Sequence, residues 1–308
     1  MTARPLRVVD LFSGAGGWSE GARAAGASVL ACVNHWPAAI ACHSANHPST
    51  DHLLEDATRL DPMRLPPHDV LLASPACQGH SRARGAERPH HDAQRATAWC
   101  VVSVAEAHRP RLLAVENVPE MATWTLFGAW RSALEALGYA LTVQVLDAAD
   151  FGVPQNRRRL VVLGSLKRAP AATRPVTSRH APAAGLIDWT LPMRRIDIGR
   201  PLAARTLQRI EAGRAAHGRR FLLSYYGATR GGRSLDRPLG TVTTKERWAL
   251  VDGDRLRMLS VDEYRAAMGF PAHYRLPGSK AEQVKLLGNA VCPPMAAAVV
   301  RQLAEAVQ

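Results

Sequence analysis

Asp10-Leu-Phe-Ser-Gly-Ala-Gly-Gly17 begins inside a short apolar run at 7–11 and leads into a helical pattern at 19–25. A strand, a glycine-rich turn and a helix in this order are typical of an α/β sheet that binds a ligand where its first strand ends. The glycines let the backbone approach the ligand, and amides at the helix N-terminus point toward an anionic group. The spacing is not Gly-x-Gly-x-x-Gly, which disfavours a dinucleotide.

Strands and helices continue to alternate through residues 1–164. Apolar runs at 28–33, 70–73, 112–115, 141–146 and 160–163 predict strands, and patterns at 37–46, 92–108 and 126–137 predict helices. This alternation predicts an α/β domain of Rossmann-like form, with a doubly wound, mostly parallel sheet and helices on both faces.

The pattern changes at residue 165. Between 165 and 235 prolines and arginines are frequent and periodicity fades, which predicts a smaller lobe that is irregular and partly β. Order returns in 236–308, where two strand-like runs flank an Asp-Gly turn. Ser260 and Ser279 each open a predicted helix with a capping box, and a last helix begins near Pro293.

Positive charge is concentrated in the predicted smaller lobe. The chain has a formal net charge of +13, and residues 165–235 contain 14 Lys and Arg against 3 Asp and Glu. A local field of this sign suits a polyanion, and arginine also recognises guanine edges with paired hydrogen bonds. The alternative is a solvated basic face without a ligand.

The composition limits the class of protein. With 47% hydrophobic residues, a chain of 308 residues can form one α/β domain and a smaller appendage. It contains no run of 18 apolar residues, and its N-terminus lacks the apolar core of a signal peptide, so we expect a cytoplasmic protein. The five cysteines have no framework-like spacing, which indicates reduced thiols.

Two reactive side chains follow predicted strands. Cys77 lies in the loop 73–81 just past one strand, and Glu116 lies just past the next. The carboxyl ends of parallel strands face the crevice in which such sheets bind ligands. A thiolate at this edge can act as a nucleophile, and a carboxyl group beside it can share a proton with the substrate. Cys32 and Cys100 lie within apolar runs and fit a buried structural role better.

Six motifs resemble, in order, those of the DNA (cytosine-5)-methyltransferase family of bacterial or phage type. They are Asp10–Gly17, the Cys77 loop, Glu116-Asn-Val118, Gln155-Asn-Arg-Arg-Arg159, Arg237-Pro-Leu-Gly-Thr-Val-Thr-Thr244 and Gly288-Asn-Ala-Val291. The resemblance implies that 1–164 form a catalytic domain that binds S-adenosylmethionine. It also implies that 165–235 form a DNA target-recognition domain, and that the final helix of 236–308 returns to the catalytic domain.

The resemblance implies chemistry on a cytosine that has left the DNA stack. Cys77 would add to C6 while Glu116 holds N3, so that C5 accepts the methyl group of S-adenosylmethionine. Arg157 would bind the target base or phosphate, and Arg159 would order the catalytic loop. Gln155 belongs to the same catalytic motif. The implied DNA contacts are Gln78, Ser81, Asn117, Val118 and Thr243.

The cofactor contacts implied by the resemblance are Asp10, Phe12, Ser13, Gly14, Ala15, Gly16, Gly17, Asn34, His35, Asp56, Pro75, Asn289 and Val291. Two positions depart from the family pattern. Asn34 stands where an acidic residue normally binds the ribose hydroxyls, and its amide can donate a hydrogen bond but carries no charge. Ala76 replaces the proline that normally precedes the nucleophile. His35 can stack on the adenine, and Asp56 matches the acid near the adenine amino group.

Three alternatives accompany this hypothesis. Cysteines and histidines crowd the second strand and helix, but their spacings match no common zinc pattern, so we expect no metal site; they are Cys32, His35, Cys42, His43 and His47. A tRNA cytosine-5 methyltransferase is disfavoured because the second lobe lacks a Cys-Phe-Thr signature. A catalytically inactive DNA-binding protein on the same scaffold is disfavoured because the implied catalytic residues are retained.

The expected partner is double-stranded DNA, which the arginine-rich lobe would recognise at a short specific site. No nuclease segment is recognised in the chain, so a restriction endonuclease would be a separate protein. We expect a monomer in the cytoplasm of a bacterium or a phage-infected cell, because such an enzyme need not match the two-fold symmetry of its site.

Overall fold

The computed structural model of the chain describes residues 4–76, 95–199, 201–225 and 231–306. Its larger part is a seven-stranded sheet of β1 (Arg7–Leu11), β2 (Ser28–Asn34), β3 (Asp51–Leu54), β4 (Val70–Ala73), β5 (Leu112–Asn117), β6 (Ala140–Asp147) and β7 (Arg158–Ser165). The strand order is β3-β2-β1-β4-β5-β7-β6, and β7 runs in the opposite direction to the other six strands. The predicted doubly wound, mostly parallel sheet is confirmed.

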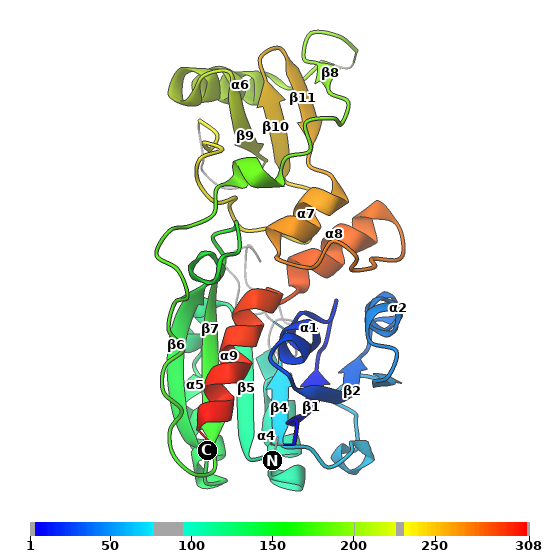
Figure 1. Cartoon of the computed structure of the whole chain (residues 1–308), viewed down its shortest axis with the longest axis vertical. Helices are drawn as coiled ribbons and strands as arrows, with labels where there is room; N and C mark the ends of the chain where they lie inside the picture. The colour runs from blue at the N-terminus through cyan, green and yellow to red at the C-terminus, as the bar shows by residue number, and fades with distance from the viewer. Residues whose placement is uncertain (1–3, 77–94, 200, 226–230, 307–308) are drawn as a thin grey trace.

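Helices cover both faces of this sheet (Figure 1). They are α1 (Gly17–Ala24), α2 (Pro37–Asn46), α4 (Trp99–His108), α5 (Phe127–Ala136) and α9 (Pro293–Glu305). Short 3-10 turns connect some elements, at η1 (Pro62–Arg64), η3 (Pro119–Thr123), η4 (Ala148–Phe151) and η5 (Ala183–Leu186). Helices α1, α2 and α9 share one buried apolar cluster, and α4 and α5 share another. Leu72 belongs to the first cluster and Leu71 to the second, because successive side chains of a strand point to opposite faces.

A second sheet forms the smaller lobe, at the top of Figure 1. It consists of β8 (Arg194–Arg195), β9 (Arg220–Ser224), β10 (Trp248–Asp252) and β11 (Arg255–Met258), in the order β8-β11-β10-β9. All its pairings are antiparallel, and the expected hairpin around the Asp-Gly turn is β10–β11. Helix α6 (Ala204–His217) packs on this sheet by burying Ile210 with Phe221 and Val251.

The boundary predicted at residue 235 falls inside this second sheet. Strand β9 precedes the boundary and β10 follows it, yet Trp248 pairs with Ser224 and Asp252 pairs with Arg220. The smaller lobe is therefore built from two chain segments that meet as neighbouring strands. Composition along the chain cannot reveal this pairing, because it depends on contacts between distant residues.

Two short helices lie between the sheets, α7 (Val261–Ala267) and α8 (Lys280–Asn289) (Figure 1). Ser260 Oγ accepts a hydrogen bond from Glu263 N, Ser279 Oγ accepts one from Glu282 N, and both glutamates return the bond. Both predicted capping boxes are present. Among the described residues, no helix has both the length and the apolar character needed to cross a membrane.

Candidate active site

A cavity opens at the carboxyl edge of the parallel strands. It encloses about 1030 Å³, including the part open to solvent. Its walls come from segments that follow β1, β2, β4 and β5, from the start of β7 and from α8. The lining residues are Phe12, Gly14, Asn34, His35, Trp36, Ser74, Pro75, Ala76, Glu116, Arg157, Arg159, Lys285, Leu286, Gly288 and Asn289. Segments distant in the sequence meet here because parallel strands bring their carboxyl ends to one edge.

The glycine-rich turn forms one end of the cavity. Phe12 and Gly14 have left-handed backbones, with φ of 62° and 54°. Ser13 N donates to Val33 O at 3.1 Å, and Gly16 N donates to Ser13 O at 2.8 Å. A left-handed φ is uncommon for a residue as bulky as phenylalanine, so these surrounding bonds must hold the turn in place. The turn thereby presents the Phe12 ring to the cavity at a fixed position.

The segment after β2 forms an aromatic wall. Asn34 Oδ1 accepts a hydrogen bond from Trp36 N at 2.9 Å, which leaves the side-chain NH₂ group of Asn34 as a donor at the cavity. Lys285 Nζ lies 4.3 Å from the centre of the Trp36 ring, a cation–π contact that ties α8 to this wall. His35 lines the cavity beside them.

An ion pair occupies the polar centre of the cavity. Glu116 is the next-to-last residue of β5, and Arg159 is the second residue of the neighbouring strand β7. Arg159 Nε lies 2.8 Å from Glu116 Oε1, and the two side chains are only 12% and 7% exposed. A nearly buried carboxylate is costly without a partner, so the guanidinium both compensates its charge and fixes its orientation.

The loop that leads to Cys77 is held from three sides. Asn117 Nδ2 donates to Pro75 O at 3.0 Å, Trp18 Nε1 donates to Ser74 Oγ at 2.9 Å, and Ala76 N donates to Thr97 Oγ1 at 3.0 Å. Asn117 is buried, so its amide supports this loop from beneath. The predicted Cys77, Gln78 and Ser81 lie outside the described residues.

Arg157 has a different environment from Arg159. Its side chain lines the cavity but is nearly buried, and Nη1 donates to Val242 O at 3.0 Å. Its Nη2 donates to Gly288 O and Ala290 O, both at 2.9 Å. The resemblance implies that Arg157 binds the target base or phosphate. In this structure its guanidinium donates to three backbone carbonyls that belong to two distant segments of the chain.

Gln155 also has structural partners. Its side chain is fully buried, Nε2 donates to Ala267 O at 2.9 Å, and Oε1 accepts from Val242 N at 2.7 Å. The carboxamide therefore joins the catalytic domain to α7 and to the segment between β9 and β10. Gln155 does not line the cavity, although the resemblance implies that it belongs to the catalytic motif.

Several predicted cofactor residues do not line the cavity; they are Asp10, Ser13, Ala15, Gly16, Gly17, Asp56 and Val291. Asp10 is fully buried, and burial raises the pKa of its carboxyl to about 7 against the opposing hydrogen bond from Ser19. Asp56 is exposed and accepts hydrogen bonds from Thr58. Gly17 packs so closely on Val291 that a Cβ would lie 3.0 Å from its backbone nitrogen.

The predicted DNA contacts at Val118 and Thr243 are also placed outside the lining of the cavity. Val118 is buried directly after β5, where its backbone nitrogen donates to Asn117 Oδ1 at 2.8 Å. Thr243 Oγ1 donates to Lys245 O at 3.0 Å, and the Thr243 backbone packs against Gly288. Both residues support neighbouring backbone in this structure.

Comparison with known proteins decides the family. Residues 6–198 and 224–305 match the family described as C-5 cytosine-specific DNA methylase. The chain belongs to this family. It is therefore a DNA methyltransferase, and the two matched ranges contain the segments that build the cavity.

Relatives of this methylase with assigned activities are bacterial type II methyltransferases. It is 27% identical to M.NlaX of Neisseria lactamica over 97% of this chain and 96% of that protein. It is 31% identical to M1.HphI of Haemophilus parahaemolyticus over 96% of this chain and 85% of that protein. A shorter match, 33% identical, joins 52% of the methylase to 39% of M.AgeI from Thalassovita gelatinovora.

Solved structures share the fold of the methylase at lower identity. A candidate DNA modification methyltransferase encoded within an E. coli prophage superimposes with a TM-score of 0.73 at 20% identity, over 98% of this chain and 99% of that one. The Dnmt2 methyltransferase of S. pombe gives a TM-score of 0.69 at 18% identity, over 99% of this chain and 100% of that one. These likenesses extend over both sheets.

Sequence reasoning assigned no contact to several residues that line the cavity of the methylase. Trp36 and Ser74 each adjoin a predicted site residue, so their nearness along the chain was a usable signal. Lys285 carries no such signal, because its place depends on how α8 packs against the segment after β2.

Proposed function

We propose that this methylase transfers a methyl group from S-adenosylmethionine to C5 of a cytosine flipped out of a short, specific site in duplex DNA. One observation carries the proposal. A single cavity joins the glycine-rich turn to the Glu116–Arg159 pair and to Pro75 and Ala76, which immediately precede Cys77. A donor site, an acid and a nucleophile are thus supported at one place.

The chemistry of the cavity suits S-adenosylmethionine as the methyl donor. Phe12, His35 and Trp36 supply flat surfaces for a purine, and Asn34 supplies a hydrogen-bond donor for a ribose hydroxyl. When bound, S-adenosylmethionine provides an electrophilic methyl group next to the target base. Asn34 is neutral, so its contact with a ribose would rely on hydrogen bonding without charge.

The residues of this chain would prepare the cytosine for that transfer. The Cys77 thiolate forms a bond to C6, and Glu116 stabilises the charge that develops on the ring by holding a proton at N3. Arg159 keeps the Glu116 carboxylate oriented toward the ring. Loss of the C5 proton then lets the sulfur leave C6 and restores the aromatic ring.

Arg157 and Gln155 are positioning residues in this proposal. Arg157 holds the backbone at Gly288 and Ala290, beside the cavity-lining Asn289. Gln155 holds Val242 and α7 against the catalytic domain. Neither side chain needs to touch DNA to be required for activity.

The proposed partner is duplex DNA, bound by a monomer whose arginine-rich lobe recognises the site. The type II relatives support a role beside a separate restriction endonuclease. A substrate of this kind agrees with action in the cytoplasm of a bacterial or phage-infected cell, which stays a prediction.

The proposal is tested with purified protein, tritiated S-adenosylmethionine, bacterial DNA and tRNA. We expect methylation of DNA at cytosine C5, mapped by bisulfite sequencing. Cys77→Ser should reduce the rate at least about 1000-fold, and Glu116→Gln should reduce it about 100- to 10,000-fold. Cys100→Ser and Glu106→Gln, on α4, are matched controls that should keep their activity.

A second readout examines the covalent step. DNA that contains 5-fluorocytosine should trap the wild-type enzyme as an adduct that survives denaturation, and Cys77→Ser should form none. Methylation of tRNA in place of DNA, or an active Cys77→Ser variant, would contradict the proposed function.

A further inference from the structure

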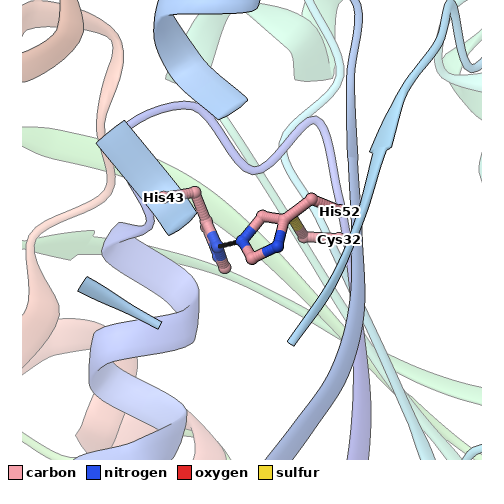
Figure 2. A group of neighbouring side chains, drawn as sticks. All are labelled: Cys32, His43 and His52. Carbon is pink, nitrogen blue, oxygen red and sulfur yellow. Dashed lines mark hydrogen bonds between the residues drawn. The ribbon is translucent and has the colours of Figure 1, made fainter. Parts of the chain in front are cut away.

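A cluster of metal-ligand side chains lies behind the glycine-rich turn, outside the cavity. Cys32 of β2, His43 of α2 and His52 of β3 each direct one ligand atom to a common point, and these atoms lie within 4.8 Å of one another (Figure 2). Cys32 and His43 are fully buried, and His52 is partly exposed. The spacing of these three residues in the sequence does not predict a metal site, because three separate elements supply them.

The register of the sheet creates this cluster. Asp10 of β1 pairs with Cys32, and Cys32 pairs with His52 on the next strand. Residues paired across parallel strands project to the same face, so an acid, a thiol and an imidazole form one row. Helix α2 covers this row with His43, as Figure 2 shows for the two histidines and the cysteine.

A hydrogen-bond chain fixes the orientation of the His43 ring. Ser19 Oγ donates to Asp10 Oδ2 at 2.7 Å, so it must accept at its 2.9 Å contact with His43 Nε2. The His43 proton is thereby assigned to Nε2, and Nδ1 presents a lone pair to the cluster. A carboxylate that orients a histidine through its far nitrogen is a recurrent arrangement behind metal-bound imidazoles.

His52 supplies the second nitrogen of the cluster. Its Nε2 lies 2.9 Å from His43 Nδ1. Because Ser19 accepts the proton of His43 Nε2, His43 Nδ1 accepts a hydrogen bond from His52 Nε2 in the metal-free protein. A metal ion between the two nitrogens would replace this hydrogen bond, with His52 then carrying its proton on Nδ1.

The carboxylate at the end of the row favours a metal ion. Asp10 Oδ1 is buried and has no hydrogen-bond partner among the described residues. Asp10 is also the register neighbour of Cys32, and its charge raises the pKa of that thiol after the larger effect of burial. A cation close to this buried carboxylate oxygen would compensate its charge.

We propose that Cys32, His43 and His52 bind one zinc ion, with a water molecule as the fourth ligand. Two nitrogens, one sulfur and one oxygen match the ligands and the tetrahedral number of zinc. Zinc–nitrogen bonds of about 2.0–2.1 Å require the two imidazoles to move apart by a few tenths of an ångström. Binding breaks the S–H bond of Cys32, forms a zinc–sulfur bond and releases the proton to solvent, with no change of oxidation state.

The ion would link β2, β3 and α2 directly behind the turn that shapes the cavity. We therefore expect it to stabilise this edge of the sheet, independently of methyl transfer. The test measures zinc per chain by plasma mass spectrometry after reconstitution and dialysis, and the melting temperature with zinc and with chelator. Wild-type protein should retain one zinc ion and melt at a higher temperature with zinc than with chelator.

Variants separate this site from adventitious binding. His52→Ala should lose the bound zinc, and its partly exposed position should preserve folding. Ser19→Ala should keep the ligands but weaken zinc binding by roughly 10- to 100-fold, because the His43 ring loses its orienting partner. His273→Ala removes an exposed histidine on another element and should bind zinc as the wild type does.

Cobalt provides a signature of the sulfur ligand. The cobalt-substituted wild type should show a thiolate charge-transfer band that is absent in Cys32→Ser. The proposal is overturned when wild-type protein retains no zinc, or when His52→Ala and wild type bind zinc equally. Either result would leave the contact between the two imidazoles as a hydrogen bond without a metal ion. Neither readout uses activity, so these experiments test the metal site independently of methyl transfer.

Discussion

At the scale of single residues, buried polar side chains connect distant segments of this methylase through hydrogen bonds. Arg157 and Gln155 both donate to backbone carbonyls of segments that lie far away in the sequence. A buried guanidinium is unfavourable unless such acceptors surround it, so the arginine and the three carbonyls stabilise one arrangement of the chain. The cavity therefore depends on residues that need no contact with a substrate.

His68 gives a prediction at the same scale. Burial lowers the pKa of its imidazole to about 4, from an ordinary value of 6.5, although a hydrogen bond to Pro66 opposes the shift and His108, Arg7 and Asp69 act more weakly. Because the folded state resists protonation, its stability is complete above about pH 6.5 and falls as the pH drops toward 4. Between pH 7.5 and pH 5, this histidine should account for roughly 1–2 kcal/mol of lost stability.

Urea unfolding followed by tryptophan fluorescence measures this contribution. His68→Asn cannot take up the proton, so its free energy of unfolding should fall less between pH 7.5 and pH 5 than that of the wild type. His273→Asn, at an exposed position, should keep the full loss. An equal loss in His68→Asn and wild type would show that other groups control the acid sensitivity.

At the scale of elements, the contact between α1 and α9 holds the glycine-rich turn against the C-terminal segment. A Cβ on Gly21 of α1 would lie 2.8 Å from Ala297 N and from Pro293 O of α9. Gly21→Ala should therefore lower the free energy of unfolding by about 1–3 kcal/mol through overpacking. Gly128→Ala on α5 meets nothing within 4 Å and should raise it by about 0.5–1 kcal/mol. Chemical denaturation compares the two, and equal effects would refute close packing of α1 on α9.

Elements that depend on local pattern could be predicted from the sequence, and elements that depend on distant pairing could not. The capping boxes at Ser260 and Ser279 involve residues three positions apart, so the sequence displays them directly. The pairing of β9 with β10 joins segments on opposite sides of the predicted boundary at 235. The sequence predicted β10 and its hairpin with β11, but it did not predict the pairing of β10 with β9.

The candidate site divides in the same way. Glu116 was predicted because the carboxyl ends of parallel strands meet at one edge of the sheet, and Phe12 was predicted from the resemblance of the turn to a family motif. The carbonyl partners of Arg157 and the meeting of Cys32 with His52 follow from packing and register, which no local motif encodes. The resemblance to a family identified residues in and around the cavity, but it did not predict the contacts that each side chain makes.

At the scale of the whole molecule, one segment connects the arginine-rich lobe to the active-site cavity. Leu239 bridges to Gln155, Asn156 N donates to Leu239 O at 2.8 Å, and Arg233 donates to Asn156 Oδ1. The chain between Arg233 and Leu239 thus runs beside the residues that lead into Arg157 and Arg159. A second cavity lies on this segment, lined by His217, Gly232, Arg233, Ser234 and Arg237.

Arg237 is exposed at this junction, where a duplex with its target base in the active site would pass. If its guanidinium contacts a phosphate, Arg237→Gln releases one fewer counterion on binding. The slope of log Kd against log salt concentration should then decrease in magnitude by about 0.9, with weaker binding at low salt. Arg131→Gln on α5, where the arginine pairs with Glu135, should leave the slope unchanged. Fluorescence anisotropy over a salt series measures both slopes, and a wild-type slope in Arg237→Gln would place the DNA backbone elsewhere on the lobe.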